Sequence, residues 1–263
     1  MRAARVGLLP IPPVWLRRGA AAAFAGLALV GTGCAVLPRD IGALEQPRAA
    51  LAAPVVPPVG LSVRTLNDVR AIIQAVVTAS FPELAGAQIV VEAFASDGDF
   101  FRSTIRPSDA LKSGPLTFVV QVNPRCFALQ ISSEAVRGVV AHELVHTAAF
   151  ATGGRPAVAA AAVVTLGAMA VPGTDAAYER RTDLEAVVRG YAADLAAFRA
   201  FQAAVLPPKI FKGKQLTYLT AAELRLSETA LKEHPALLAR WRHQPPASLA
   251  EMTAEVSAAA DRR

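Results

Sequence analysis

The five residues His142-Glu143-Leu144-Val145-His146 are the part of this chain best suited to chemistry. They form the pattern H-E-x-x-H, in which the two histidines lie four residues apart and so share one face of a helix. Both imidazoles can then reach a single metal ion, while Glu143 can hold a water molecule beside that ion. The chain has only four histidines, so this spacing predicts a metal site that activates water.

A catalytic zinc ion, Zn²⁺, usually has three protein ligands and one open position, so the motif needs a third ligand. The strongest candidate is Glu179, which lies four residues before Asp183 on a helix expected to start at Thr174 or Asp175. Asp183 shares the helical face of Glu179 and could accept the free N–H of a zinc-bound histidine.

Other assignments of these acidic residues stay open. Glu185 is a weaker candidate for the third ligand. Glu179 and Asp183 could also form a solvated charged face with the two arginines at positions 180 and 181. Cys126 could be a thiolate ligand, although its surroundings favour a buried, inert thiol.

Such a site could hydrolyse a peptide bond. Zinc lowers the pKa of a bound water and polarises the substrate carbonyl, and Glu143 would act as the general base. A hydrogen-bond donor beside the oxyanion is also expected. The sequence does not choose among four candidates for this donor: Arg189, Tyr191, Tyr218 and His234.

The order and spacing of the two motifs, HExxH followed by ExxxD, resemble those of the gluzincin zinc metallopeptidases. They are similar in particular to the HtpX and CAAX prenyl protease group, over roughly residues 115–200. Many members of that group carry several membrane-spanning helices, whereas this chain shows none after its start, so a soluble, envelope-exposed member is the nearer comparison. The resemblance implies a role for each motif residue: zinc ligands His142, His146 and Glu179, general base Glu143, and Asp183 as the partner of a histidine.

Residues 1–33 resemble a lipoprotein signal peptide. Four arginines are their only charges, and the apolar stretch Ala20–Val30 is too short for a comfortable membrane span. Small residues then precede Cys34, as in the bacterial lipobox, although Gly31 stands where leucine is more usual. A lipidated Cys34 would anchor the protein in the membrane of a bacterial cell envelope, facing the periplasm or the cell exterior. An uncleaved anchor and ordinary cleavage are the alternatives.

The basic charge gives no reason to expect a nucleic-acid partner. Removing the four arginines of the signal leaves 23 basic residues against 21 acidic ones, so the net charge falls from +6 to +2. The expected partners are instead a peptide or protein substrate and the membrane.

The remaining chain predicts one α+β domain. A Pro- and Ala-rich tether over 34–60 precedes a zincin-like catalytic domain over 61–243 and a loosely attached helical tail over 244–263. A small antiparallel or mixed sheet should pack on the HExxH helix and on a second, ligand-bearing helix. The expected elements are helices over 65–80, from Ser132 or Ser133 to Gly153-Gly154, from 174 or 175 to about Val205 and over 220–233, and strands over 88–95, 100–105 and 116–122.

Two segments carry functional alternatives. If 116–122 is the edge strand beside the cleft, an extended peptide could pair with it, although a core strand fits equally well. The uncharged segment Ala157–Val171 could be a buried or hairpin-forming helix, or else a membrane-dipping segment or lid. The competing functions are a non-catalytic zinc-binding envelope scaffold and a latent peptidase covered by that segment.

Overall fold

The structure of the protein is a computed structural model. It describes residues 60–106, 116–168 and 174–262, with side chains described outside 153–175. The expected signal peptide, Cys34 and the tether up to residue 59 lie outside the described residues, and so do residues 169–171 and the other side chains of the uncharged segment Ala157–Val171.

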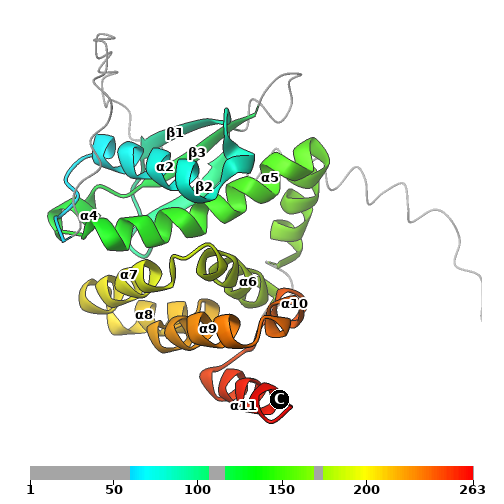
Figure 1. Ribbon diagram of the computed structural model, residues 1–263. Helices are drawn as coiled ribbons and strands as arrows, with labels where there is room; N and C mark the ends of the chain where they lie inside the picture. The colour runs from blue at the N-terminus through cyan, green and yellow to red at the C-terminus, as the bar shows by residue number, and fades with distance from the viewer. Residues whose placement is uncertain (1–59, 107–115, 169–173, 263) are drawn as a thin grey trace, which may run out of the picture. The chain divides into compact units, whose positions relative to one another are not determined.

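Three short strands form a small mixed sheet: β1 (Gln88–Ala93), β2 (Phe101–Ile105) and β3 (Thr117–Val122). Their order across the sheet is β1-β3-β2, with β1 parallel and β2 antiparallel to β3 (Figure 1). The three predicted strands are confirmed, and so is the α+β class.

Of the two positions left open for the strand over 116–122, the structure confirms the core position and excludes the edge. Residues of β3 pair with β1 on one side and with β2 on the other, so its backbone offers no free edge to a peptide. The side chains explain this position, because Val119 is buried on one face of the strand and Val120 on the other. A peptide that extended this sheet would have to pair with β1 or β2.

Helices make up most of the rest of the described chain. They are α2 (Leu66–Ser80), the 3₁₀ turn η1 (Pro82–Leu84), α4 (Arg125–Ala128), α5 (Ser133–Ala168), α6 (Thr174–Val188), α7 (Ala192–Val205), α8 (Pro208–Thr217), α9 (Ala221–Glu233), α10 (Ala236–His243) and α11 (Leu249–Ala260).

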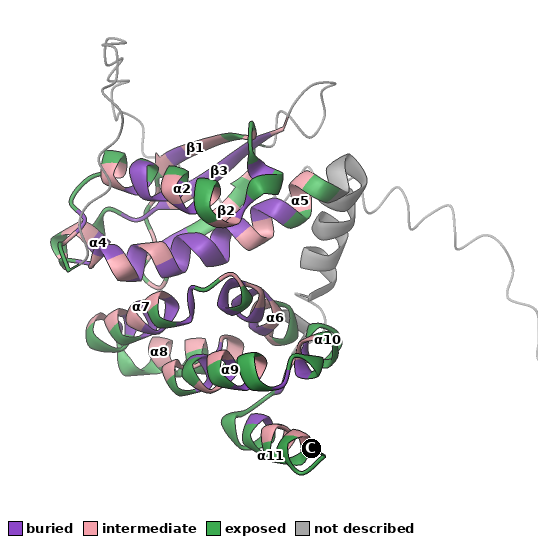
Figure 2. Cartoon of the chain, in the orientation of Figure 1, coloured by how far each residue is buried: buried purple, intermediate pink, exposed green. Residues whose placement is uncertain are grey.

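Helix α5 lies between two layers, with α2 and the sheet on one side and α6 and α7 on the other (Figure 1). The helix begins where predicted, since the Ser132 hydroxyl accepts a hydrogen bond from the Ala135 N–H. Buried residues then follow around its whole circumference up to the motif (Figure 2). This arrangement explains why the sequence around the motif is apolar on more than one face, and it places the motif inside the protein.

Two predicted helix boundaries are wrong. Helix α5 continues past Gly153, Gly154 and Pro156 to Ala168, because the alanine-rich sequence that follows favours helix strongly enough to outweigh these breakers. The second motif helix was expected to run on to Val205, but it ends at Val188. Gly190 has a φ of 94°, and the Tyr191 N–H bonds back to the Ala186 carbonyl, as in a glycine-terminated helix.

The C-terminal helix is attached more closely than the sequence suggests. Met252 of α11 is fully buried, and its sulfur lies 3.4 Å from the Ser227 hydroxyl of α9. Glu255 accepts a hydrogen bond of 2.5 Å from the indole N–H of Trp241. Residues before and after the expected domain boundary at 243 therefore contact one another.

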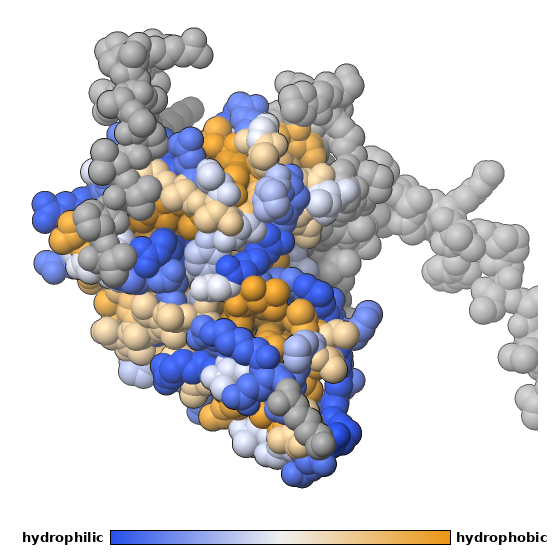
Figure 3. All heavy atoms as spheres, viewed as in Figure 1, coloured by the Kyte–Doolittle hydropathy of each residue, from blue (hydrophilic) through white to orange (hydrophobic). Residues whose placement is uncertain are grey.

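Hydrophilic and hydrophobic residues both occur over the face shown in Figure 3. None of the helices in the described part of the chain combines the length and the hydrophobicity needed to cross a bilayer. The large hydrophobic side chains left exposed are scattered over different segments: Leu61, Tyr178, Val188, Leu216 and Leu249.

The contact between α5 and α7 depends on Gly138, which lies one helical turn before His142. A Cβ atom at position 138 would lie 2.3 Å from the backbone of Asp194 and Leu195, closer than real Cβ atoms approach any backbone atom. Beside this contact, Arg137 forms a two-pronged ion pair with Asp194, with distances of 2.9 and 3.1 Å. The glycine thus sets how closely α7 approaches the helix of the motif.

Replacing Gly138 by alanine should destabilise the protein by about 3 kcal/mol or more, because neither backbone can move without shifting a helix. Gly213 of α8 is a matched control, since nothing lies within 4 Å of a Cβ atom built there. Gly213→Ala should leave the free energy of unfolding unchanged or raise it by up to about 1 kcal/mol. Urea denaturation of both variants measures the difference, and equal stabilities would contradict this account of the α5–α7 contact.

Candidate metal centre

The predicted site residues come together from two helices. His142, Glu143 and His146 lie on α5, and Glu179 and Asp183 lie on α6, which packs against α5. His142 and Glu143 are buried, with exposed fractions of 4% and 7%, and Asp183 is fully buried. The fold therefore brings the two sequence motifs, HExxH on α5 and ExxxD on α6, next to each other.

Three side-chain atoms form a compact triangle. The Nε2 atoms of His142 and His146 are 3.3 Å apart, and Glu179 Oε2 lies 3.1 Å from the first and 3.4 Å from the second. Ligand atoms placed tetrahedrally at the usual zinc distances of about 2.0–2.1 Å would be about 3.3 Å from one another. Among the side chains that the structure describes, these three form the group able to hold a metal ion.

The partners of the two imidazoles direct their other nitrogens toward this triangle. His142 Nδ1 lies 2.8 Å from Asp183 Oδ1, and His146 Nδ1 lies 3.0 Å from the Tyr178 hydroxyl. With the ring protons at Nδ1, both Nε2 atoms present lone pairs to the centre of the site. Glu179 Oε2 is buried there and accepts no hydrogen bond of normal geometry from any described residue. In this tautomer, three atoms with free lone pairs converge, and such a group can bind a cation.

Without a cation, protons compensate for the buried charges. Burial would lower the pKa of His142, but the hydrogen bond to Asp183 and the charges of Asp183 and Glu179 raise it to about 10. Burial would raise the pKa of Glu179, and the two histidines outweigh it and hold this pKa below its ordinary value. A metal ion bound at the triangle would replace the proton on His142 Nε2.

Asp183 is the most fully bonded group of the site. Its carboxylate receives two hydrogen bonds from Arg199 Nη2, at 2.9 and 3.0 Å, and one from the Leu219 N–H at 2.8 Å, besides its contact with His142. Burial would raise the pKa of Asp183, but the charge of Arg199 and the bonds from His142 and Leu219 lower it. An ionised Asp183 thus orients His142, as predicted from the sequence.

Sequence reasoning missed Arg199 and Tyr178. Arg199 occupies the buried stripe of α7, four residues after Leu195, and an arginine at such an apolar position was the available signal. Tyr178 stacks on the His146 ring, with centroids 5.2 Å apart, and its position next to Glu179 gave no hint of this role. Each histidine therefore has a hydrogen-bonding partner of its own.

The alternative of a solvated charged face on α6 is wrong. Arg180 has an exposed fraction of 3% and forms an ion pair of 2.6 Å with Glu223, and it also donates to the carbonyls of Tyr218 and Pro246. Arg181 donates to the His243 carbonyl. These arginines connect α6 to the C-terminal helices and do not form a hydrated face with the acidic residues.

The alternative third ligands lie elsewhere. Glu185 forms an ion pair with Arg242 at the edge of α10. Cys126 is fully buried in α4, and burial raises the pKa of its thiol to about 12, so it is a protonated thiol at neutral pH. Neither belongs to the group that could hold a metal ion.

Of the four candidates for the oxyanion donor, three are engaged away from the site. The Tyr191 hydroxyl bonds to the Ser80 hydroxyl at 3.0 Å, and Arg189 pairs with Glu83 at 2.6 Å. His234 ends α9 and lines a separate pocket with residues of α10 and α11. Tyr218 is the candidate beside the metal centre, with its ring centroid 5.7 Å from that of His142.

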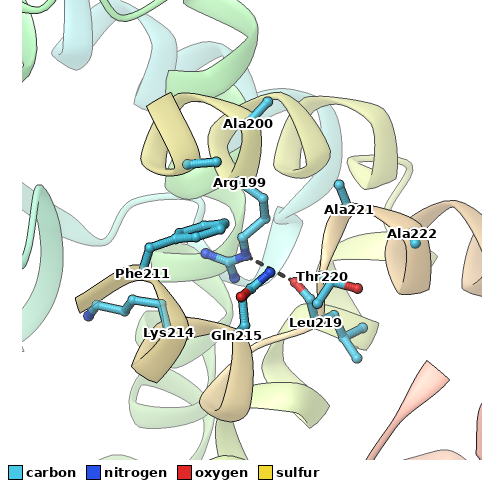
Figure 4. Close-up of a pocket in the computed structure, with 10 residues that line it drawn as sticks. Arg199, Ala200, Phe211, Lys214, Gln215, Leu219, Thr220, Ala221 and Ala222 are labelled. Atoms are coloured by element: carbon cyan, nitrogen blue, oxygen red, sulfur yellow. Dashed lines mark hydrogen bonds between the residues drawn. The ribbon is translucent and has the colours of Figure 1, made fainter. Parts of the chain in front are cut away.

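A pocket of about 260 Å³ lies next to the Arg199 side chain but contains none of the motif residues (Figure 4). Helices α7 and α8 and the start of α9 form its walls, and Arg199 Nε donates to the Leu219 carbonyl at its edge. The pocket therefore lies next to Arg199, which holds Asp183, and not next to the triangle of candidate ligand atoms.

Compared with protein-family models, with curated proteins and with solved structures, the chain matches none. The resemblance to the gluzincins therefore depends on the two sequence motifs alone.

Replacing Glu179 by alanine should weaken zinc binding by at least about 100-fold, because it removes one of three converging ligand atoms. Glu185→Ala on the same helix is the matched control, and it should keep the zinc affinity of the parent protein. Competition with a chromogenic zinc chelator measures both affinities. Normal zinc binding by the Glu179 variant would place the third ligand elsewhere.

Replacing Arg199 by alanine should destabilise the protein by about 3–5 kcal/mol, since it leaves the carboxylate of Asp183 buried without its countercharge. Zinc affinity should fall by about 10–100-fold, because His142 loses its fixed partner. Arg225→Ala, at an exposed position on α9, should change neither quantity. Thermal unfolding and chelator competition test both effects, and an unaffected zinc affinity would separate Arg199 from the metal centre.

Proposed function

We propose that this protein is a zinc-dependent metallopeptidase that hydrolyses peptide bonds with Glu143 as general base. The observation that carries the proposal is the convergence of His142 Nε2, His146 Nε2 and Glu179 Oε2, which lie within 3.4 Å of one another. Two nitrogens and one carboxylate oxygen are a ligand set typical of catalytic zinc.

Glu143 is placed to act as a general base. It directly follows the first proposed zinc ligand in the chain, and it is buried at the same site, with an exposed fraction of 7%. When bound, zinc would lower the pKa of a water molecule and polarise the substrate carbonyl. Glu143 would accept the proton of the attacking water and deliver it to the nitrogen of the departing amine.

The arrangement of the elements supports a zincin-like catalytic domain. Helix α5 carries HExxH and contacts strand β2, and α6 brings the third ligand from the opposite side. The motif order resembles that of gluzincins of the HtpX and CAAX prenyl protease type. We further propose that the domain acts on peptides or proteins at a bacterial cell envelope, anchored through a lipid on Cys34.

Glu143→Gln should keep the zinc content and lower the kcat for cleavage of an unfolded protein by on the order of 10³-fold, because the amide cannot accept the proton. Fluorescein-labelled, denatured casein is a suitable substrate, and a chelator should abolish its cleavage. Glu228→Gln on α9 is a matched control, since Glu228 contacts Lys232 and not the site. Retained cleavage by the Glu143 variant would exclude this residue as the base.

A non-catalytic zinc-binding role in envelope assembly is the second candidate. The observation that favours it is the low exposure of His142 and Glu143, at 4% and 7%, which leaves a substrate little access. Both functions predict bound zinc, and they differ in turnover. Zinc-loaded protein that cleaves none of a varied set of unfolded proteins would favour the scaffold.

A further inference from the structure

The segment that links α8 to α9 is fixed by the same groups that support the metal centre. The Leu219 N–H donates to Asp183 at 2.8 Å, and Arg199 Nε donates to the Leu219 carbonyl at 3.1 Å. Arg180 Nη1 donates to the Tyr218 carbonyl at 3.3 Å. Because Asp183 also bonds to His142, a single carboxylate sets the position of a metal ligand and of the backbone next to Tyr218.

The Tyr218 ring is held from two sides. It meets the His142 ring at 61°, with centroids 5.7 Å apart, and the Arg199 guanidinium carbon lies 4.6 Å from its centroid. Lys214 Nζ lies 5.4 Å from the same centroid. These contacts fix the plane of the ring next to a zinc ligand.

The hydroxyl of Tyr218 is left without a hydrogen-bonding partner among the described residues. A phenol hydroxyl of this kind can donate a hydrogen bond to an oxygen that approaches it. The Tyr178 hydroxyl differs, because it is already bonded to His146.

We propose that the Tyr218 hydroxyl is a further catalytic group, which donates a hydrogen bond to the carbonyl oxygen of the substrate peptide as that oxygen becomes an oxyanion. This role rests on the proposed peptidase function. The water oxygen bonds to the carbonyl carbon, and the π electron pair moves to the carbonyl oxygen, where Tyr218 donates and keeps its own proton. Glu143 takes the water proton and delivers it to the nitrogen as the C–N bond breaks.

Tyr218→Phe keeps the ring and removes only the hydroxyl, so zinc content and the unfolding temperature should be unchanged. The kcat for cleavage of denatured casein should fall by about 10²–10³-fold, with a much smaller change in KM. Binding of inorganic phosphate, a tetrahedral anion, to the cobalt-substituted protein should weaken at least about 10-fold, as followed by the visible absorption of cobalt. Tyr191→Phe is the matched control and should retain both kcat and phosphate affinity.

The two measurements separate this role from the peptidase function itself. If the parent protein cleaves casein in a Glu143-dependent way and Tyr218→Phe stays within about threefold of the parent kcat, the role of Tyr218 is refuted and the function stands. If no protein is cleaved, phosphate binding decides. Weaker binding by Tyr218→Phe supports the donor although the peptidase function fails, and unchanged binding overturns the donor role.

Discussion

The buried carboxylate of Asp183 is the interaction on which the rest of the site depends. A fully buried negative charge is costly, and here Arg199, His142 and the Leu219 N–H together offset that cost. These partners come from α7, α5 and the segment before α9, so the charge on α6 joins four parts of the fold. One group therefore supports both the orientation of His142, a candidate metal ligand, and the packing of the helical layer.

Helix α5 is part of the hydrophobic core and also bears two of the three candidate metal ligands. Its residues face the sheet and α2 on one side and α6 and α7 on the other, and they are buried all round up to His142. Gly138 sets the distance to α7, the helix that carries Arg199. A site built on such a helix inherits the rigidity of the core, which suits ligands that must hold fixed positions.

The local part of this architecture could be predicted from the sequence, and the long-range part could not. The spacing of His142 and His146, and that of Glu179 and Asp183, follows from helical periodicity alone. The central position of β3 and the burial of Arg180 and Arg199 depend on strands and carbonyls far away in the chain. Gly190 did carry a local signal for the break between α6 and α7, but the apolar spacing on both sides obscured it.

The candidate ligands His146 and Glu179 are separated in sequence by residues 147–178, and this separation would link metal binding to folding. An ion held by side chains of α5 and α6 would act as a cross-link that closes the intervening segment, and it would bind the folded chain in preference to the unfolded one. Loss of the ion would then loosen the attachment of α6 before it disturbed the sheet. A chain without the ion would in this way resist degradation less than one that holds it.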